Sequence, residues 1–380
     1  MKRTLFTNGR VYADGRFQET DLLVEDGRIA GFGGRADETV DLGGRMLVPG
    51  FLDLHTHGGD GVDVNAATAE DLAKIGRFFA GNGTTGWLCS ILTDTPEQTL
   101  WCIAQAKAAM NAPVTGAQLM GIHLEGPFLS AEYKGAMPEH LLQKGSAELF
   151  RRYQAAADGA VRYITVSPEV EGVVDMIGEL SGHVTVAIGH SGADYETACA
   201  AIDAGAAACT HTFNAMGLFH QHRPGIMGAV LERPVMCEAI CDGRHLHPGS
   251  VRMLLACKGY DRVVAVTDSI QAAGLPDGHY KLGVNDVVVV DGDAKLAESG
   301  VRAGSTLTTG QALKNLVKFT GESVETVLPL LTANPARLIG MDHRKGSIAP
   351  GKDADLVVLD QELNVKVTYV AGVKVYAGEM

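Results

Sequence analysis

The sequence has few of the features that mark secreted or membrane proteins. Its seven cysteines are odd in number and scattered, without a Cys-x-x-Cys pair, so we expect buried thiols and not a disulfide framework. No run of about 18 uncharged apolar residues occurs, which argues against a membrane-spanning helix. The N-terminal segment also lacks the long apolar core and the cleavage site of a secretory signal. We therefore expect a cytoplasmic protein.

Positive charge and aromatic side chains are also scarce. The chain has 32 lysines and arginines against 45 aspartates and glutamates, a formal net charge of −13, and 6% aromatic residues. This balance argues against nucleic acid or an anionic membrane as the main partner, while a small anionic substrate needs only local positive charge. With 380 residues, 46% hydrophobic and 20% charged, the chain is an ordinary globular protein, long enough for a large barrel and an accessory module.

Two histidines follow an apolar run in the first part of the chain. Residues 46–54 predict a buried strand, and His55 and His57 come directly after it, before the break at Gly58-Gly59. Because residues i and i+2 of a strand share a face, both imidazoles can point to one place. A lone histidine is more often a satisfied core residue, but such a pair favours metal ligands.

Seven more apolar segments follow the first, with helical spacing in most of the gaps. The eight segments are residues 46–54, 86–92, 119–124, 161–166, 184–188, 206–210, 235–240 and 263–267. Helix start signals in the gaps are Thr68-x-x-Asp71, Thr95-Pro96, Ser146, Ser191-x-x-Asp194 and His247-Pro248. Continuous apolar strands that alternate with helices predict an α/β fold, a closed (β/α)8 TIM barrel. The alternative is an open doubly wound sheet, but no G-x-G-x-x-G or P-loop follows a first strand.

The two ends of the chain have a different pattern. Short apolar stretches separated by Asn-Gly and Asp-Gly turns predict small antiparallel strands in residues 1–48, and residues 354–375 have the same texture. Neither end can bury much surface alone. We therefore predict that both ends form one small β-sandwich module from residues 1–48 and 345–380, flanking a barrel of residues 49–344.

Most of the predicted strands end in polar residues capable of catalysis. In a (β/α)8 barrel the C-terminal strand ends form the mouth that carries the active site. Glu125, His190 and His211 offer three ligands to a divalent metal and leave a position for water. A second site could be built or completed by His55, His57 and Asp268. Asp268 is our candidate general base, and its alternative role is a helix N-cap beside Thr267.

Three further residues are candidates for substrate contact. Arg223 stands in a long loop after the sixth segment and either binds an anionic group through its guanidinium or is solvated. Asn214 and His245 could either contact the substrate or support their loops. Their position directly after predicted strands favours substrate contact. Ser191 lies outside any G-x-S-x-G motif, so it fits a helix cap better than a nucleophile.

These motifs resemble the amidohydrolase superfamily and, within it, the N-acetylglucosamine-6-phosphate deacetylase family, over nearly the whole chain. PGFLDLHTHG at 49–58 and PGKDADL at 350–356 are typical of the superfamily. The deacetylase family is indicated by HLEGPF at 123–128, GHS at 189–191, TH-x-x-NAM at 210–216, DG-x-H at 242–245 and AGS at 303–305. The resemblance implies a cytoplasmic homodimer that hydrolyses N-acetyl-D-glucosamine 6-phosphate to D-glucosamine 6-phosphate and acetate, in amino-sugar catabolism and cell-wall recycling.

The resemblance also implies roles for individual residues. Glu125, His190 and His211 are the principal ligands of a divalent metal, zinc or iron, and Asp268 is the acid/base. Asn214, Ala215, Arg223 and His245 contact the sugar phosphate, and in the family an arginine of this loop comes from the neighbouring subunit. Because this chain keeps His55 and His57, the resemblance implies one or two metals per subunit.

One position departs from the family pattern. The family commonly has a polar residue, often histidine, after Lys-Gly-Ala, whereas this chain has Met137. Methionine cannot donate a strong hydrogen bond to the acetyl carbonyl of a substrate. We therefore expect that a metal polarises the carbonyl, that His123 or His140 takes over the contact, or that the preferred substrate differs.

Other functions remain as alternatives. The same chemistry could act on another amino-sugar phosphate, for example N-acetylgalactosamine 6-phosphate. Cyclic-amide hydrolysis is disfavoured because the fourth segment has no lysine to bridge two metals. A non-catalytic binding barrel predicts the loss of ligands, and the acidic charge opposes a nucleic-acid deaminase.

Overall fold

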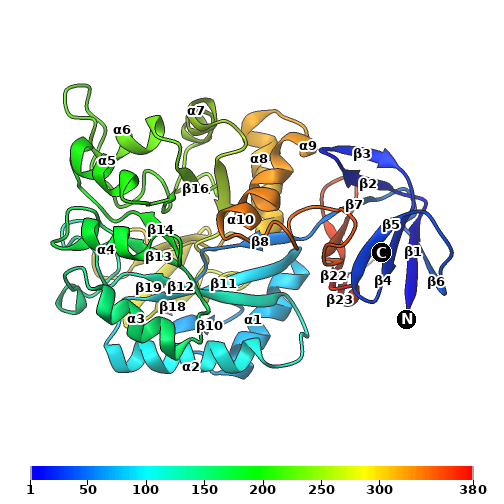
Figure 1. Cartoon of the computed structure of the whole chain (residues 1–380), viewed down its shortest axis with the longest axis horizontal. Helices are drawn as coiled ribbons and strands as arrows, with labels where there is room; N and C mark the ends of the chain where they lie inside the picture. The colour runs from blue at the N-terminus through cyan, green and yellow to red at the C-terminus, as the bar shows by residue number, and fades with distance from the viewer. Residues whose placement is uncertain (1, 379–380) are drawn as a thin grey trace.

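The computed structural model describes residues 2–378 and contains a barrel of eight parallel strands (Figure 1). In hydrogen-bonded order, the strands are β8 (Phe51–Asp53), β11 (Thr84–Leu92), β12 (Gln118–Glu125), β13 (Val161–Val166), β14 (Thr185–Ile188), β15 (Ala208–Cys209), β16 (Met236–Ile240) and β17 (Val263–Val266). The first and last strands are joined where Asp268 N donates to His55 O at 2.8 Å and Thr267 Oγ1 donates to Asp53 Oδ2 at 2.6 Å. The predicted (β/α)8 barrel is confirmed.

Helices alternate with these strands along the chain. They are α1 (Ala69–Gly81), α2 (Pro96–Met110), α3 (Ala147–Ala156), α4 (Val173–Leu180), α5 (Tyr195–Asp203), α6 (Gly225–Glu232), α7 (Pro248–Lys258), α8 (Thr309–Thr320), α9 (Val324–Val327) and α10 (Ala333–Leu338), with short 3₁₀ turns η1 (Val64–Ala66), η2 (Glu139–Leu141) and η3 (Leu328–Leu331). The predicted caps Thr68, Thr95, Ser146 and His247 each accept a hydrogen bond from the first turn of their helix. Among residues 2–378, no helix has the length and apolarity needed to cross a bilayer.

The prediction that Ser191 caps a helix is wrong. The cap of α5 is Asp194, whose side chain accepts a hydrogen bond from Thr197 N at 2.8 Å. The hydroxyl of Ser191 instead donates to Glu169 Oε2 at 2.7 Å and accepts from Ala193 N at 3.0 Å. Ser191 therefore anchors the turn that directly follows His190.

The two ends of the chain form sheets beside the barrel, at the right of Figure 1. One sheet has the order β5-β4-β1-β6 and the other β23-β22-β21-β7-β2-β3. Their strands are β1 (Arg3–Thr7), β2 (Arg10–Ala13), β3 (Arg16–Glu19), β4 (Leu22–Glu25), β5 (Arg28–Phe32), β6 (Glu38–Asp41), β7 (Met46–Pro49), β21 (Leu356–Leu359), β22 (Val365–Val370) and β23 (Val373–Ala377). Val48 of β7 lies opposite Val357 of β21, and Phe6, Leu47 and Leu356 share a buried apolar cluster. The predicted pairing of the two chain ends is confirmed.

Residues 46–54 do not form one strand, contrary to the sequence prediction. Residues 46–49 form β7 in the terminal sheet, and residues 51–53 form β8 in the barrel. The break falls at Gly50, where an added Cβ would lie 2.0 Å from Thr85 Oγ1. Close approach to β11 therefore requires glycine at the point where the chain passes from one sheet to the other.

The sequence prediction also missed a small sheet between β17 and α8. Its strands are β18 (Gly278–Leu282), β19 (Asn285–Val290) and β20 (Asp293–Leu296), and a shorter hairpin, β9 (Gly58–Gly59) with β10 (Val62–Asp63), follows the first barrel strand. Leu282, Val287 and Val289 pack in one apolar cluster with Leu92 and Met137. The inserted sheet therefore covers the C-terminal ends of neighbouring barrel strands.

Candidate active site

The C-terminal ends of the barrel strands open into a cavity of about 410 Å³. Its lining includes the predicted site residues His57, Glu125, His190, His211, Asn214, Ala215, His245 and Asp268. These residues come from the ends of five strands, β8, β12, β14, β15 and β16, and from the segment after β17. The position is the one at which (β/α)8 barrels carry their active sites.

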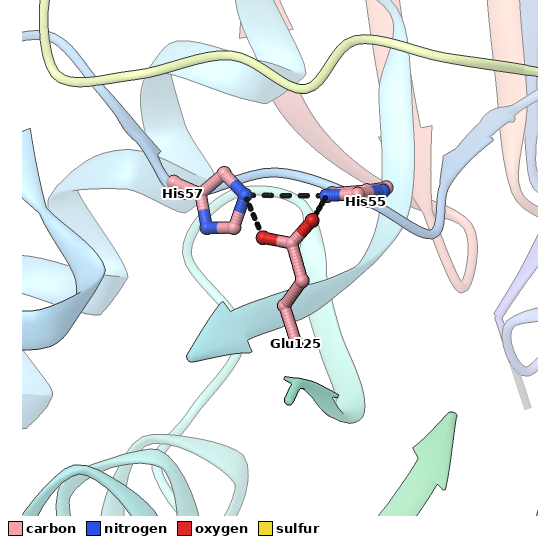
Figure 2. Close-up of side chains that lie close together, drawn as sticks. All are labelled: His55, His57 and Glu125. Atoms are coloured by element: carbon pink, nitrogen blue, oxygen red, sulfur yellow. Dashed lines mark hydrogen bonds and ion pairs between the residues drawn. The ribbon is translucent and has the colours of Figure 1, made fainter. Parts of the chain in front are cut away.

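Glu125 lies at the centre of two groups of potential metal ligands. His57 Nε2 is 3.1 Å from Glu125 Oε2, and His55 Nε2 is 3.4 Å from Glu125 Oε1 (Figure 2). On its other side, His190 Nε2 and His211 Nε2 lie 3.1 and 3.4 Å from Oε1. In each group, all potential ligand atoms lie within 4.8 Å of one another. Glu125 is thus placed to serve both groups.

The hydrogen bonds on the far side of the rings decide which nitrogens are free. His57 Nδ1 is 3.0 Å from Ser90 O, and His190 Nδ1 is 2.8 Å from Tyr133 O. A backbone carbonyl only accepts, so each Nδ1 carries the proton and each Nε2 presents a lone pair to the cavity in the neutral ring. These two rings are therefore oriented as metal-bound histidines are, with a hydrogen-bond acceptor behind Nδ1, whereas His211 Nδ1 is buried without a hydrogen-bond partner.

The contacts between the rings indicate that a cation belongs among them. His190 Nε2 and His211 Nε2 are 2.9 Å apart, and His55 Nε2 and His57 Nε2 are 3.2 Å apart. Two lone pairs repel at these distances unless a proton or a metal ion lies between them. Four imidazoles and a shared carboxylate, with no thiolate, are a donor set that suits a divalent metal. The residues therefore fit one or two metal ions.

Three residues of this cluster have positive φ angles: His190 at 49°, His211 at 25° and Asp268 at 49°. A non-glycine residue in this region costs about 1–3 kcal/mol, so the surroundings must hold it there. Ser167 Oγ donates to His190 O at 2.6 Å, and Glu238 Oε2 accepts from His211 N at 2.9 Å. Strained backbone of this kind concentrates at functional sites. Here the three strained residues all direct their side chains toward the same cavity.

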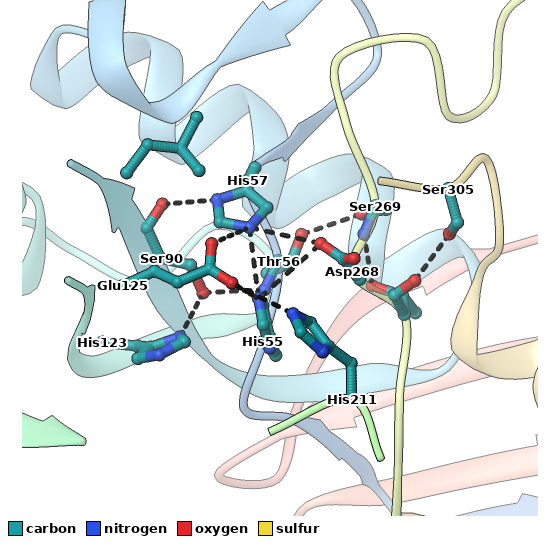
Figure 3. Close-up of polar contacts among 12 residues, drawn as sticks. His55, Thr56, His57, Ser90, His123, Glu125, His211, Asp268, Ser269 and Ser305 are labelled. Atoms are coloured by element: carbon teal, nitrogen blue, oxygen red, sulfur yellow. Dashed lines mark hydrogen bonds and ion pairs between the residues drawn. The ribbon is translucent and has the colours of Figure 1, made fainter. Parts of the chain in front are cut away.

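Asp268 faces the histidine pair from the last strand (Figure 3). Its Oδ1 is 3.2 Å from His57 Nε2 and 3.6 Å from His55 Nε2. Burial raises its pKa, but the charges of His55 and His57 outweigh burial and lower the pKa below its usual value, so the carboxylate is ionised at neutral pH. The helix-cap alternative is wrong, because the next helix, α8, begins at Thr309 with Thr308 as its cap.

The segment Ala303-Gly304-Ser305 holds Asp268 in place. Ser305 N donates to Asp268 O at 2.7 Å, and an added Cβ at Gly304 would lie 2.9 Å from the same oxygen. Gly304 also has a φ of 61°, which disfavours other residues. This motif therefore supports the loop that carries the candidate base.

The charges of the cluster predict how the metal-free protein responds to alkaline pH. Burial lowers the pKa of His57, but Glu125 and Asp268 outweigh burial and raise it to about 9; the pKa of His55 is likewise raised, against burial, by Glu125, Glu238 and Asp268. A pKa above the unfolded value of about 6.5 means that the stability gained is complete below that pH and is lost as pH rises through about 9. We expect the Tm of chelator-treated protein to fall by a few degrees from pH 7 to 10.

Thermal unfolding over this pH range, with and without added metal, checks the prediction. The metal-loaded protein is the control, because ligated imidazoles have no proton on Nε2 to lose. A Tm of the metal-free protein that is constant from pH 7 to 10 would contradict the charged state of the histidine pair.

The candidate substrate contacts divide into two groups. Asn214, Ala215 and His245 line the cavity, and Asp242 Oδ2 lies 2.7 Å from His245 Nδ1 and orients the ring. Arg223 is exposed in the loop before α6 and does not line the cavity within this chain. Arg223 therefore does not contribute to the cavity of its own chain.

His123 does not reach the cavity, which corrects its expected role as a substrate contact. Its side chain is fully buried beneath the cluster, and its ring nitrogens lie 2.8 Å from Ser90 Oγ and 2.8 Å from Thr165 Oγ1. His140 is exposed in η2 and is also not part of the lining. Met137 lines the cavity, 3% exposed, in an apolar wall with Leu92 and Leu282. Neither histidine therefore replaces the polar residue that the chain lacks at Met137.

Sequence reasoning missed several residues of the site. Arg302 and Lys134 line the cavity and bring positive charge, and the guanidinium of Arg302 is held by both oxygens of Asp293 at 2.8 and 3.1 Å. Glu238 lies fully buried behind His55. The signal for Glu238 was present, since one acid interrupts the apolar segment at 235–240. Arg302 and Lys134 stand in loops with no comparable pattern.

Comparison with known proteins gives a consistent result. Residues 46–375 match the amidohydrolase family. The N-acetylglucosamine-6-phosphate deacetylase of Bacillus subtilis (strain 168) is 35% identical over 332 residues, covering 86% of this chain and 84% of that protein. The N-acetylgalactosamine-6-phosphate deacetylase of Escherichia coli O157:H7 is 34% identical, covering 94% and 95%. A mutant N-acetyl-D-glucosamine-6-phosphate deacetylase of Mycobacterium smegmatis, solved in complex with N-acetyl-D-glucosamine-6-phosphate, has a TM-score of 0.93 at 33% identity, covering 99% of this chain and all of that one.

Proposed function

Since the chain belongs to the amidohydrolase family, we propose that it removes the N-acetyl group from an amino-sugar phosphate. The substrate that fits best is N-acetyl-D-glucosamine 6-phosphate, which water splits into D-glucosamine 6-phosphate and acetate. The observation that carries this proposal is the cluster of Glu125, four histidines and Asp268 at the barrel mouth, in a chain similar over its length to enzymes named for this reaction. Amino-sugar catabolism and cell-wall recycling are the corresponding pathways.

The residues of the cluster have separate roles in this proposal. Glu125, His190 and His211 hold the principal divalent metal, and His55 and His57 complete a second position with Glu125. A bound divalent metal lowers the pKa of water and polarises a carbonyl. Asp268, ionised and facing the same space, takes a proton from the attacking water and returns it to the departing amine. Met137 offers no donor to the acetyl carbonyl, so no side chain at that position shares its polarisation.

Groups on the polar side of the cavity bind the sugar phosphate. Asn214, Ala215 and His245 lie there, and Lys134 and Arg302 supply cationic charge within the chain. Arg223 completes the site from a second copy in a homodimer. The dimer is supported by the exposed loop before α6, where the side chains of Leu218 and Phe219 are 86% and 57% exposed, as expected of a surface that another subunit covers.

The metal and the compartment follow from residue chemistry. Imidazole with carboxylate suits zinc or iron among the divalent metals. All seven cysteines are free, and five of them are buried, which supports the reducing cytoplasm.

Acetate release from sugar substrates tests the proposed function. We expect kcat/KM for N-acetylglucosamine 6-phosphate to exceed that for the unphosphorylated sugar about 100-fold or more, because each charge-assisted hydrogen bond to phosphate contributes about 1.5–3 kcal/mol. N-acetylgalactosamine 6-phosphate is the second candidate substrate, favoured by the Escherichia coli relative. A metal-loaded protein that releases no acetate from either phosphate sugar would overturn the proposal and support a non-catalytic barrel.

A further inference from the structure

Glu238 is a buried carboxylate in the middle of a barrel strand. It lies in β16 between Cys237 and Ala239, and all three residues are completely buried. Among residues 2–378, no lysine or arginine forms an ion pair with Glu238; its only charged contact is His55. A buried acid is costly to retain, and packing alone would be served better by an apolar residue.

One oxygen of Glu238 holds two strands of the candidate metal centre together. Glu238 Oε2 lies 3.0 Å from His55 Nδ1 and accepts a hydrogen bond from the backbone N of His211 at 2.9 Å. His55 belongs to one ligand group and His211 to the other. Because Oε2 serves both, the carboxylate fixes the distance between the segments that carry the two groups.

The same contact sets the chemical state of His55. Glu238 Oε2 already accepts from His211 N, so in the neutral ring of His55 the hydrogen is on Nδ1 and the lone pair on Nε2 faces Glu125 and His57. In Figure 2 the Nε2 side of the His55 ring faces these two residues. His57 and His190 have backbone carbonyls behind them, whereas His55 depends on a side chain.

The backbone of His211 needs a similar constraint. With a φ of 25°, His211 occupies a region that a histidine leaves unless something holds it. The hydrogen bond from its N to Glu238 and that from Thr212 N to Glu238 O, at 3.0 Å, tie this turn to β16. The side chain and backbone of one residue thus support the bend from which His211 reaches Glu125.

We propose that Glu238 is a positioning residue of the metal centre, which orients His55 and His211 and so sets the geometry of both ligand groups. The inference rests on the proposed metal-dependent function. Glu238 Oε1 makes no hydrogen bond to either ligand group, and burial together with the charge of Glu238 raises the pKa of the Tyr163 hydroxyl; only Oε2 contacts the segments that carry the metal ligands. The expected consequence of losing Glu238 is loss of metal affinity, not only loss of stability.

Metal content and affinity test this proposal without reference to activity. Zinc per chain is measured by elemental analysis after dialysis, and zinc affinity by competition with a chelator, for wild type, Glu238→Ala and Glu238→Gln. We expect Glu238→Ala to bind zinc about 10- to 100-fold more weakly, as is usual when the partner behind a ligand histidine is removed. Glu238→Gln should recover most of the affinity, because its amide oxygen can accept the same two hydrogen bonds.

A control variant separates positioning from general stability. Thr165 is also completely buried in the barrel, where its hydroxyl contacts His123 and Thr210 but none of the four ligand histidines. Thr165→Val should lower Tm while leaving zinc affinity within about twofold of wild type. Folded Glu238→Ala protein that binds zinc as wild type does would overturn the proposal.

The result remains decisive if Glu238→Ala does not fold. Glu238→Asp keeps the charge but is one methylene too short to reach both His55 and His211, so its affinity must also fall; unchanged affinity in a folded Glu238→Asp protein would refute the positioning role. Wild-type protein that binds no zinc would instead count against the proposed function. The two failures are therefore distinguishable.

Discussion

Replacing Asp268 with asparagine is expected to lower kcat for acetate release by about 10³-fold, with little change in KM. Asparagine keeps the shape of the side chain but cannot take a proton from water or return one to the amine. General acid–base catalysis contributes about 10²- to 10⁴-fold to the rate. Asp268 acts twice in the proposed reaction, as the base toward water and as the acid toward the amine. Its contacts with His57 and His55 at 3.2 and 3.6 Å place the carboxylate beside the ligand cluster, where the reacting water must lie.

Two measurements show that the loss comes from proton transfer. Zinc content of Asp268→Asn should stay near that of wild type, because Glu125 and the four histidines remain. Asp286→Asn is a matched control: Asp286 is an exposed acid of the inserted sheet, paired with Lys281, and its loss should leave kcat unchanged. Turnover of Asp268→Asn within tenfold of wild type would remove Asp268 from the role of base.

The sequence predicts the architecture and most of the candidate ligands because both depend on local patterns. Apolar runs buried on both faces mark parallel strands. The polar residues after each run gather at one end of the barrel, whatever the conformation of the loops. Glu125, His55, His57, His190, His211 and Asp268 could all be found in this way. Their convergence within a few ångströms follows from the closure of the barrel.

The remaining features depend on contacts between distant parts of the chain. The division of residues 46–54 between two sheets is decided by the approach of Gly50 to Thr85, and no run of apolar residues reveals it. His123 lies two residues before Glu125 in β12 and shares its face of the strand, yet it lies deeper in the barrel, where its ring contacts the hydroxyls of Ser90 and Thr165. Arg302 lines the cavity from a loop, with its guanidinium bound to Asp293 of the inserted sheet.

Glu238 is a residue whose special role the sequence indicates but whose contacts the sequence does not identify. A charged residue inside an apolar strand predicts a special role, but its partner is chosen by the neighbouring strands. Here the neighbouring strand β15 brings His211 to it, and closure of the barrel between β17 and β8 brings His55 to it. The pairing becomes visible only when the barrel is closed.

Glu125→Ala is expected to abolish metal binding at both positions and to lower acetate release by about 10⁴-fold or more. Glu125 is the only residue shared by the two ligand groups found among residues 2–378, so its removal opens both, whereas His55→Ala opens one. The metal contributes several kcal/mol to such a reaction, and each 1.36 kcal/mol is tenfold in rate. His55→Ala should therefore lose less activity, about 10- to 100-fold. It keeps Glu125, His190 and His211 and should still bind one metal there.

Chelation and add-back separate the two variants. Wild type and His55→Ala should lose activity in a strong chelator and regain it with excess zinc, while Glu125→Ala should not respond to zinc at any concentration that leaves the protein soluble. The pH at which zinc is added matters, because His57, with a metal-free pKa of about 9, must release its proton before it can bind; recovery should be faster at pH 8.5 than at pH 6.5. Full activity of Glu125→Ala without metal would show that the histidine cluster is structural and that the reaction runs without it.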